Sequence, residues 1–301
     1  MVMMMEKEIL EKYLKAGKIN QEAKAFARKE LKPGVKVLDL AENIEKLIKE
    51  KGAGIAFPVN ISLNDIAAHY TPDIDDTLTL KEGDLVKVDI GTHIDGYIGD
   101  SAFSVRLGEK SDVLIKAAED ALEQFIKTVR PGKTVDELSL LVDEVVTSHG
   151  VNPIRNLAGH SVEQYRQHGG LSIPNGHVPI NQELKEGQAI GMEVFTTTGE
   201  GLVKESSPTL IYMFLQLKPV RSRESRKILQ LVSDRFLTLP FARRWLKNVG
   251  SSIRLQLALK ELVNREVLRE YPPLREKSHS LVAQAEETII VMDKPIITTR
   301  S

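Results

Sequence analysis

The 301-residue sequence predicts an α+β fold made of two similar α/β halves related by a pseudo-two-fold axis. A basic residue, Pro and Gly open an amphipathic helical segment at Lys32–Gly52, and the same pattern returns at Arg130–Gly150. A Leu-Lys-Glu-Gly turn opens a strand that ends in a carboxylate at Asp89, and a second such strand ends at Glu193. One four-residue match would be coincidence. The same order of helices, strand and acid in both halves is typical of an internal duplication.

Composition narrows the class of protein. The chain is 42% hydrophobic and 28% charged with a formal net charge of -1, which gives no general attraction to nucleic acid or anionic membrane. It has no cysteine, so disulfides, thiolate metal ligands and thiol nucleophiles are excluded. The longest apolar run, Leu210–Leu215, is too short to span a bilayer, and charged residues follow Met1–Met5 at once, unlike a secretory signal. We therefore expect a cytoplasmic protein without a membrane partner.

Each half is predicted to begin with two helices. Apolar residues recur at helical spacing in Glu6–Leu31, and a Pro-Gly turn separates this segment from a helix that Gly52 ends. Ser111–Val129 takes the same place in the second half, before its own Pro-Gly turn. Thr134 and Glu137 then predict a capping box at the start of the helix that follows.

A β-hairpin is predicted after the first helix pair. Asp84–Ile90 and Tyr97–Val105 carry alternating apolar residues, and a turn that contains Gly96 joins them. Either two-residue turn puts Asp89 and Asp100 on one face, directly opposite or one diagonal step apart, with Cβ atoms roughly 5–8 Å apart. A lone aspartate is usually just solvated. Two apposed aspartates repel, so this pair requires a cation, a shared proton or open solvent.

The second hairpin is predicted to be split by an insert. No returning strand follows Glu193 closely, because the next residues are mostly helical in pattern. The predicted division is a larger domain of residues 1–200 and 280–301 and a helical insert of residues 201–279. The helices expected in the insert are Ser222–Val232, Leu239–Lys247 and Ser252–Leu268.

The second half supplies further carboxylates. Two strands joined by an Asp-Lys-Pro turn follow the insert, and Glu286 or Glu287 opens the first of them as the expected partner of Asp100. With Asp89 and Glu193, four carboxylates meet near the shared axis and repel unless cations neutralise them. Carboxylates with one imidazole favour Mn, Fe, Co or Zn. Two such ions about 3.5–4 Å apart can activate water and polarise a carbonyl, so the pattern predicts a two-metal hydrolase.

Three of the seven histidines are candidate site residues: His69, His160 and His168. Any one histidine is more often a surface or satisfied core residue. His160 follows Gly159 in a polar loop that leads into the acid-bearing half, which is where a metal ligand is expected.

These residues lie in motifs that resemble the type II methionine aminopeptidases of archaeal pattern, over essentially the whole chain. The resemblance implies the pita-bread fold, with a winged-helix-like insert that marks type II. The motifs are FPVNISLNDIAAHYTP (Phe57–Pro72), KVDIGTHIDGYIGDSA (Lys87–Ala102), NLAGHSVE (Asn156–Glu163), GMEVFTT (Gly191–Thr197), PTLIYMF, LPFARRW and AQAEETIIV (Ala283–Val291).

The resemblance also implies a ligand set. Asp89 would chelate one metal ion, Asp100 and Glu286 would bridge two, and His160 and Glu193 would complete the second. The motif alignment selects Glu286 over Glu287 as the ligand. Two departures from the family pattern are Val194, where many relatives have Pro or Thr, and Glu287, where many have His.

The remaining implied roles concern the substrate. In the family, the residue matching Glu193 is also the base that shuttles a proton from water. His69 would contact the scissile amide, and His168 would donate to the developing oxyanion. Phe57 resembles part of an apolar pocket that suits the flexible thioether of methionine.

The implied activity is removal of the initiator methionine from peptides and nascent chains when the second residue is small, by a monomer with two divalent ions (Co, Mn, Fe or Zn). A proline dipeptidase would use the same ligands, but normally with a separate N-terminal domain, whereas this chain enters its helix pair at once. A non-enzymatic relative that binds nucleic acid or protein would lose ligands, and all five are present here.

The insert is rich in basic residues, and such a run is usually a solvated helix face. Methionine excision acts on chains that emerge from ribosomes, so the alternative is a weak, salt-dependent contact with ribosomal RNA through its phosphates. Glu224 and Asp234 are candidate ion-pair partners that would favour the first interpretation. The basic residues are Lys218, Arg221, Arg223, Arg226, Lys227, Arg243, Arg244 and Lys247.

Overall fold

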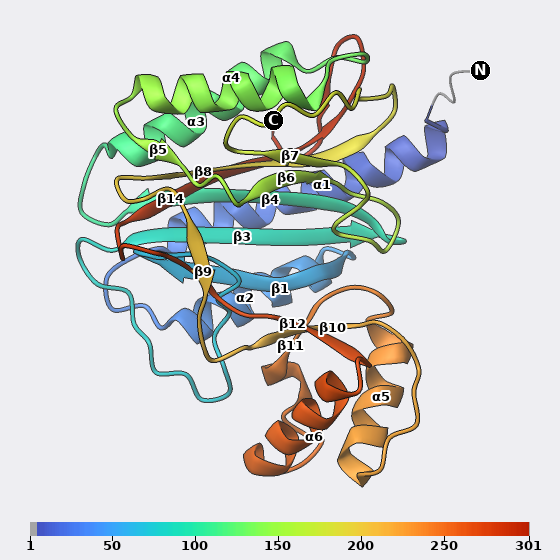
Figure 1. The fold of residues 1–301 in the computed structure, drawn as a ribbon. Coiled ribbons are helices and arrows are strands. Elements are labelled where there is room, and N and C mark those ends of the chain that lie inside the picture. The colour runs from blue at the N-terminus through green and yellow to red at the C-terminus, as the bar shows by residue number, and fades with distance from the viewer. Residues whose placement is uncertain (1–4, 301) are drawn as a thin grey trace.

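A nine-stranded sheet organises the molecule, with helices on its outer side and the insert at one end (Figure 1). The computed structural model describes residues 5–300. The main path through the sheet is β1-β3-β4-β14-β8-β6-β7, while β15 pairs with β14 and β5 pairs with β8. The strands are β1 (Gly54–Leu63), β3 (Leu85–Ile94), β4 (Tyr97–Arg106), β5 (Asn152–Pro153), β6 (Ala158–Ser161), β7 (Ser172–Pro174), β8 (Ala189–Thr197), β14 (Val282–Ile290) and β15 (Ile296–Ile297).

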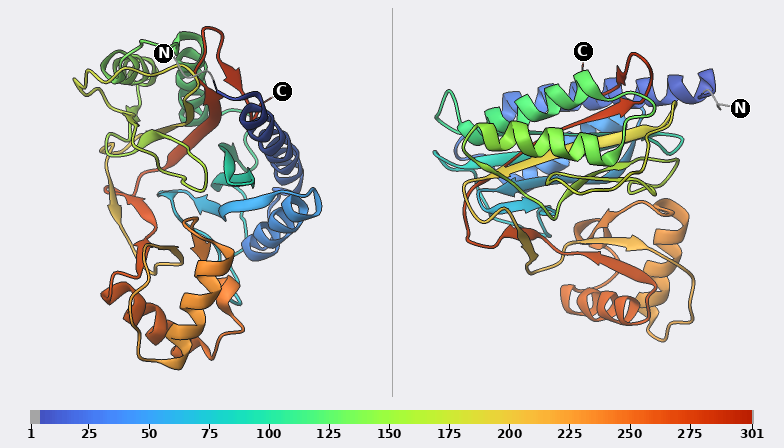
Figure 2. Two further views of the ribbon diagram at one scale, coloured as in Figure 1. Left: turned by 90° about the vertical axis from the view of Figure 1, so that its right-hand side faces the viewer. Right: turned by 45° about the horizontal axis from the view of Figure 1, so that its top comes forward.

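Both predicted helix pairs are confirmed: α1 (Lys7–Glu30) with α2 (Val37–Glu50), and α3 (Val113–Thr128) with α4 (Val135–Ser148). Figure 2 shows the pairs side by side on the outer surface of the curved sheet. The first pair packs its apolar face on β1 and β3, and the second packs on β8 and β14, so each half has its own core. None of the helices in residues 5–300 is both long and apolar enough to cross a membrane.

The first hairpin has the tight turn that the sequence predicts. Ile94 pairs with Tyr97, and between them Asp95 and Gly96 have φ of 50° and 86°. Positive φ at both positions is the requirement of a type I′ turn, which Asp-Gly satisfies well. Asp100 then pairs with Gly91, so it lies one diagonal step from Asp89 rather than directly opposite.

The second hairpin is split, as predicted. β8 and β14 are antiparallel neighbours, and Glu193 lies opposite Glu286. One detail of the prediction is wrong, because Glu286 and Glu287 lie in the middle of β14 and not at its start. β14 also pairs with β4 through Glu286 and Ala102, and this places the acids of both hairpins on adjacent central strands.

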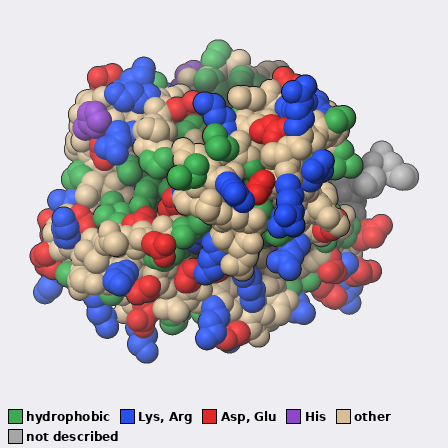
Figure 3. Space-filling view, turned by 90° about the horizontal axis from the view of Figure 1, so that it is seen from below, with side chains coloured by type: hydrophobic (Ala, Val, Ile, Leu, Met, Phe, Trp, Pro, Cys, Tyr) green, Lys and Arg blue, Asp and Glu red, His purple; other side chains and the backbone are tan. Residues whose placement is uncertain are grey.

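The insert is mixed rather than mostly helical. Helices α5 (Arg223–Arg235) and α6 (Ser252–Asn264) pack on a three-stranded sheet of β11, β10 and β12. Its strands are β10 (Ile211–Phe214), β11 (Phe241–Ala242) and β12 (Leu268–Tyr271). Seen from the side of the insert, Lys and Arg side chains are interspersed with Asp and Glu (Figure 3).

Two predicted helices of the insert need correction. The segment Leu239–Lys247 contains β11 followed by the 3₁₀ helix η1 (Arg243–Leu246), because Phe241 pairs with Tyr212 and a strand partner overrides local propensity. The segment Ser252–Leu268 is helical only to Asn264, and its last residue already begins β12.

The ends of the insert connect to the larger part through a small sheet. Strands β9 (Val203–Glu205) and β13 (Leu274–Glu276) pair with each other, and β13 also pairs with β2 (Ile66–Ala68). The domain boundaries at residues 201 and 279 therefore stay a prediction.

Candidate metal centre

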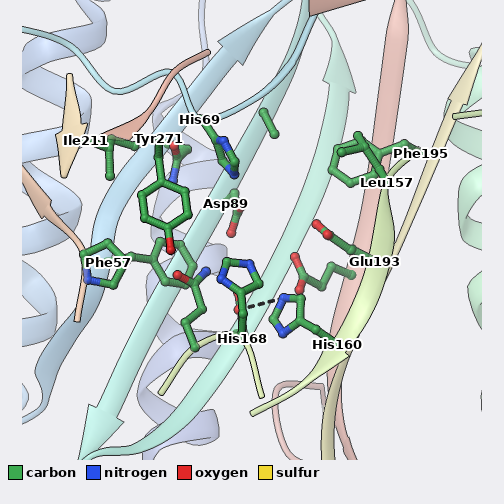
Figure 4. A pocket seen from close by; sticks show the side chains of 16 residues that line it. Phe57, His69, Asp89, Leu157, His160, His168, Glu193, Phe195, Ile211 and Tyr271 are labelled. Carbon is green, nitrogen blue, oxygen red and sulfur yellow. Dashed lines mark ion pairs between the residues drawn. The ribbon is translucent and has the colours of Figure 1, made fainter. Parts of the chain in front are cut away.

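The four central strands and β6 aim acids and a histidine into one pocket on the inner side of the sheet (Figure 4). β3 and β4 contribute Asp89 and Asp100, while β8 and β14 contribute Glu193 and Glu286. His160 comes from β6, which pairs with β8 next to Glu193. The structure thus brings together all five residues that the resemblance implied as ligands.

Three of these side chains lie within reach of a single ion. One ligand atom from each of Asp100, His160 and Glu286 lies within 4.8 Å of the others. His160 Nε2 is 4.0 Å from Asp100 Oδ2. All three side chains are buried, with Asp100 only 1% exposed. Gly191 keeps this space open, since a Cβ there would lie 3.1 Å from Glu286 Oε1 and 3.3 Å from His160 Cε1.

Several polar atoms of the cluster have no hydrogen-bond partner among the described residues. They are buried, whereas nearly all buried polar atoms in folded proteins are paired. The atoms are Asp89 Oδ1, Asp100 Oδ1 and Oδ2, His160 Nδ1 and Glu286 Oε1. Clustered carboxylate oxygens and imidazole nitrogens without partners are a donor set that fits a divalent metal ion.

The electrostatics of the cluster lead to the same conclusion. Burial raises the pKa of Asp89 to about 7. Burial, together with the charges of neighbouring acids, holds the pKa of Asp100, Glu193 and Glu286 well above their usual range. Burial also lowers the pKa of His160 to about 3, so its imidazole is neutral and keeps a lone pair for a metal. A bound cation would reverse the shift of the carboxylates, because it favours their charged form.

Gln284 belongs to the cluster and was not anticipated from the sequence. Its Nε2 lies 3.4 Å from Glu193 Oε2 and 3.3 Å from Glu286 Oε2, so one amide links the two acids. The signal that could have found it is its position two residues before Glu286 on the same face of β14.

Glu287 points to the opposite side of the sheet. Both of its oxygens accept hydrogen bonds from Lys24 Nζ, at 2.9 and 2.8 Å, and Thr299 Oγ1 donates at 2.5 Å. The structure therefore places Glu286 and not Glu287 in the pocket. The other departure, Val194, is fully buried in the core under α3 and α4.

His69 and His168 line the same pocket as the acids. His69 Nδ1 lies 3.3 Å from Pro272 O, and the His168 ring stacks on Tyr271 with centroids 6.1 Å apart. Burial and the neighbouring His168 lower the pKa of His69 to about 4. Partial removal from water and the nearby Arg269 guanidinium lower the pKa of His168 to about 4. Both rings are neutral at neutral pH and can donate one N–H.

An apolar wall completes the pocket. Phe57, anticipated from the sequence, lies opposite Gly91 in the β1–β3 pair, where a Cβ on the glycine would meet the ring at 2.3 Å. Sequence reasoning missed the other wall residues, because they come from segments that only the fold assembles. They are Leu157 and Phe195 from the larger part and Ile211, Pro240 and Tyr271 from the insert.

Comparisons with known proteins show which family the chain is similar to. Residues 11–213 match the model of metallopeptidase family M24. The chain is 48% identical to a methionine aminopeptidase of Pyrococcus abyssi over 96% of its own length and 99% of the relative's. It is 43% identical to one of Methanocaldococcus jannaschii, over 98% and 100%.

Solved structures confirm the predicted pita-bread fold. A thermophilic Arx1 superposes with a TM-score of 0.87 at 21% identity, covering 98% of this chain and 91% of that one. A methionine aminopeptidase of Thermotoga maritima superposes with a TM-score of 0.72 at 22% identity over all of both chains. A prolidase of Pyrococcus furiosus gives 0.62 at 17% identity, over 99% of this chain and 65% of its own. The sequence relatives and the family match together show that the chain belongs to the methionine aminopeptidases of metallopeptidase family M24.

Proposed function

We propose that this protein removes N-terminal methionine from peptides and nascent proteins whose second residue is small, with two divalent metal ions as cofactors. The observation that carries the proposal is the pocket of five metal-ligand side chains with unpartnered buried atoms, next to an apolar wall. Two relatives that are 48% and 43% identical over nearly the whole chain are both named methionine aminopeptidase, which supports the proposal.

The five side chains divide between the two ions in this proposal. Asp89 would hold one ion, His160 and Glu193 would hold the other, and Asp100 and Glu286 would be shared between them. When bound, the ions would polarise the scissile carbonyl and lower the pKa of the attacking water. The choice among Co, Mn, Fe and Zn is left to experiment, because all four accept carboxylate and imidazole ligands.

The chain's own groups move protons and orient the peptide. We assign Glu193 as the carboxylate that accepts a proton from the attacking water and delivers it to the leaving amine. His69 turns Nδ1 toward Pro272 O, which leaves Nε2 to face the scissile amide. Neutral His168 donates to the carbonyl oxygen as negative charge develops there, which stabilises the transition state more than the substrate.

The apolar wall accounts for the preference of the pocket for an N-terminal methionine side chain. Phe57 and Phe195 line the pocket together with residues of the insert, and the unbranched thioether of methionine can adapt to such an irregular apolar space. The acids lie at the inner end, so the scissile bond would lie against them with the methionine side chain on the wall.

Metal reconstitution tests the proposal directly. The protein is stripped of metal with a chelator, and Mn, Co, Fe and Zn are added back separately while release from Met-Ala, Met-Leu and Ala-Pro peptides is followed. We expect no release without metal, recovery with at least one ion, and faster release from Met-Ala than from Met-Leu. Hydrolysis of Ala-Pro alone would instead identify a proline dipeptidase, and no hydrolysis with any ion would support a non-enzymatic relative.

We also propose a weak contact between the insert and ribosomal RNA. Residues 201–279 carry 16 Lys and Arg against 7 Asp and Glu, a net charge of +9. The rest of the chain carries 25 against 35, a net charge of -10. This separation of charge between the insert and the rest of the chain would orient the positive insert toward a polyanion. The affinity for the polyanion would fall steeply as the salt concentration rises.

Three of the basic residues predicted for this surface are already paired. Lys218 pairs with Glu266, Arg243 with Asp73, and the buried Arg244 with Glu45. Of the candidate partners, Glu224 pairs with Arg254 instead. The exposed cations at the start of α5 have no ion-pair partner within residues 5–300, and they are Arg221, Arg223, Arg226 and Lys227.

Charge reversal at α5 tests the contact. Changing Arg221, Arg223 and Arg226 to Glu should weaken co-sedimentation with ribosomes at low salt and leave peptide turnover unchanged. Lys218→Ala, on the same insert but within an exposed pair, is the matched control. Wild-type protein that shows no salt-dependent co-sedimentation would contradict the proposal.

A further inference from the structure

One wall of the pocket is carried by the insert rather than by the large sheet. Ile211, Pro240 and Tyr271 line it. Ile211 pairs with Tyr271 on one side and with Ala242, two residues after Pro240, on the other. Since all three wall residues are part of or adjoin the sheet of β10, β11 and β12, any shift of that sheet against the large sheet moves them together.

A buried carboxylate joins the insert to β1, the strand that carries Phe57 of the pocket. Glu45, on α2, is 4% exposed. Its Oε1 pairs with Arg244 Nη2 and accepts a hydrogen bond from Val59 N at 3.3 Å. Its Oε2 accepts a hydrogen bond from Trp245 Nε1 at 2.9 Å. Glu45, Arg244 and Trp245 are called the Glu45 latch below.

Both ends of the latch lie close to the pocket. Val59 follows Phe57 by two residues on β1. Arg244 lies in η1, directly after β11 and four residues after Pro240. Arg244 also donates to Thr71 Oγ1 and, at 3.2 Å, to Pro72 O, so both of its terminal nitrogens are used. The latch therefore connects β1, which carries Phe57 of the pocket, with the insert segment that carries Pro240, and only a few residues separate it from either wall residue.

The ion pair and hydrogen bonds of the latch are better suited to fixing the position of the insert than to adding net stability. A buried ion pair contributes little net stability compared with an apolar contact of the same volume, but its hydrogen bonds fix direction. The adjacent Arg243–Asp73 pair is more exposed, with side chains 15% and 26% accessible, so water weakens its directional hold. The LPFARRW motif contains both latch residues of the insert together with Pro240 of the pocket wall.

We propose that Glu45 is a positioning residue that holds the insert sheet against β1 through Arg244 and Trp245, and thereby sets which N-terminal side chains the pocket accepts. This rests on the proposed aminopeptidase function. Without the latch the insert wall recedes, so the pocket loses complementarity to methionine and discriminates less against branched side chains. The metal ligands lie on the large sheet and do not move, so the loss affects binding rather than the chemical step.

The test compares Glu45→Gln and Trp245→Phe with wild-type metal-loaded protein. kcat and KM are measured on Met-Ala-Ser and Leu-Ala-Ser, and calorimetry measures the affinity of L-methionine and L-leucine. For Glu45→Gln we expect KM for Met-Ala-Ser to rise about tenfold at similar kcat, as for loss of one charge-assisted hydrogen bond, and the preference for methionine to shrink. Trp245→Phe should show a smaller change in the same direction.

The only tryptophan of the chain gives a readout independent of turnover. Trp245 donates to Glu45, so Glu45→Gln should shift its fluorescence emission. Lys218→Ala, which breaks an exposed pair within the insert, is the control and should change neither emission nor selectivity. A shifted emission with unchanged KM and unchanged methionine preference would overturn the proposal.

A second variant covers the case in which Glu45→Gln does not fold. Glu45→Leu with Arg244→Met replaces the pair by apolar groups of similar volume, which commonly preserves folding. Reduced methionine preference in this folded variant supports the latch, and wild-type preference overturns it. If wild-type protein binds methionine selectively but releases none, the aminopeptidase function fails, and the calorimetric preference alone decides on the latch in the same way.

Discussion

Buried carboxylates occur in two settings in this molecule, the metal cleft and the Glu45 latch. Asp100 is 1% exposed and Glu45 is 4% exposed, so depth of burial does not separate them. Their partners do. Both oxygens of Asp100 lack a hydrogen-bond partner among the described residues, whereas both oxygens of Glu45 are paired with donors from the insert and β1.

The difference shows that a cluster of unsatisfied acids, and not burial alone, marks the cleft, since single unpaired acid oxygens such as Glu276 Oε1 also occur elsewhere among the described residues. In the cleft, carboxylates lie close to one another and repel unless a cation neutralises them. In the latch, opposite charges meet, and the Arg244 guanidinium neutralises the Glu45 carboxylate without a ligand. Substitutions in the two settings should therefore have different and partly opposite consequences.

The largest effect is expected in the cleft. Asp100→Asn or Glu286→Gln should reduce kcat/KM by more than about 100-fold, the upper range for residues that only support ligands, while the protein remains folded. Circular dichroism and metal content are measured in parallel. Retention of most activity with full metal occupancy in either variant would show that these acids are not bridging ligands.

Breaking one side of the latch should give the largest loss of stability. Arg244→Met leaves Glu45 buried without its counter-charge and should lower the free energy of unfolding by about 3–5 kcal/mol. Urea denaturation measures this. The paired change Glu45→Leu with Arg244→Met should recover most of the loss, and failure to do so would mean that the pair supplies net stability itself.

The two histidines of the cleft, His160 and His168, are expected to differ in role. His160→Ala should lower metal affinity, measured by calorimetric titration, because His160 lies within the donor cluster. His168→Ala should lower kcat and kcat/KM alike, by about 10²–10³, with metal affinity unchanged, because its proposed role is to stabilise the transition state. Equal loss of bound metal in both variants would contradict this division.

The sign of a pH effect separates the cleft from ordinary paired acids. Burial raises the folded-state pKa of Asp89 to about 7 from an ordinary 3.8. For a raised pKa, the stability contribution is fully present below the unfolded value and is lost as pH rises through the folded value. In metal-free protein, Asp89→Asn should therefore gain stability relative to wild type between about pH 4 and pH 7.

The same comparison of stability between wild type and Asp89→Asn can be made with metal added. Wild type should be stabilised by the ion more than Asp89→Asn is, because the variant lacks one of the proposed ligands. Thermal melts at several pH values, with and without metal, give both results. A constant difference between the two proteins across the pH range would indicate that Asp89 carries no elevated pKa.

The smallest effect on activity is expected at Glu287, although it adjoins a cleft acid in sequence. Glu287→Gln weakens the pair with Lys24 on the far side of the sheet and leaves every pocket residue in place. Its kcat/KM should stay far above that of Glu286→Gln. A loss as large as that of Glu286→Gln would mean that the strand register of the site is wrong by one residue.

Much of this site follows from the sequence alone, because its signals are local and repeated. The helix pairs, the Asp-Gly hairpin turn and the Thr134–Glu137 capping box each depend on residues within a few positions of one another, and all are confirmed. The period of two along a strand places Asp89 and Asp100 on one face. The family motifs then distinguish Glu286 from Glu287, which local pattern alone left open.

Only the tertiary structure decided the insert's part in the site. Phe241 is a strand residue because Tyr212 pairs with it, and Arg244 is a buried latch residue rather than a surface cation because Glu45 lies opposite. The insert wall likewise comes from three separated segments that one small sheet joins. These contacts join residues about 30 to 200 positions apart, and nothing in the local sequence encodes a partner at that separation, since pairing depends on how the two surfaces meet after folding.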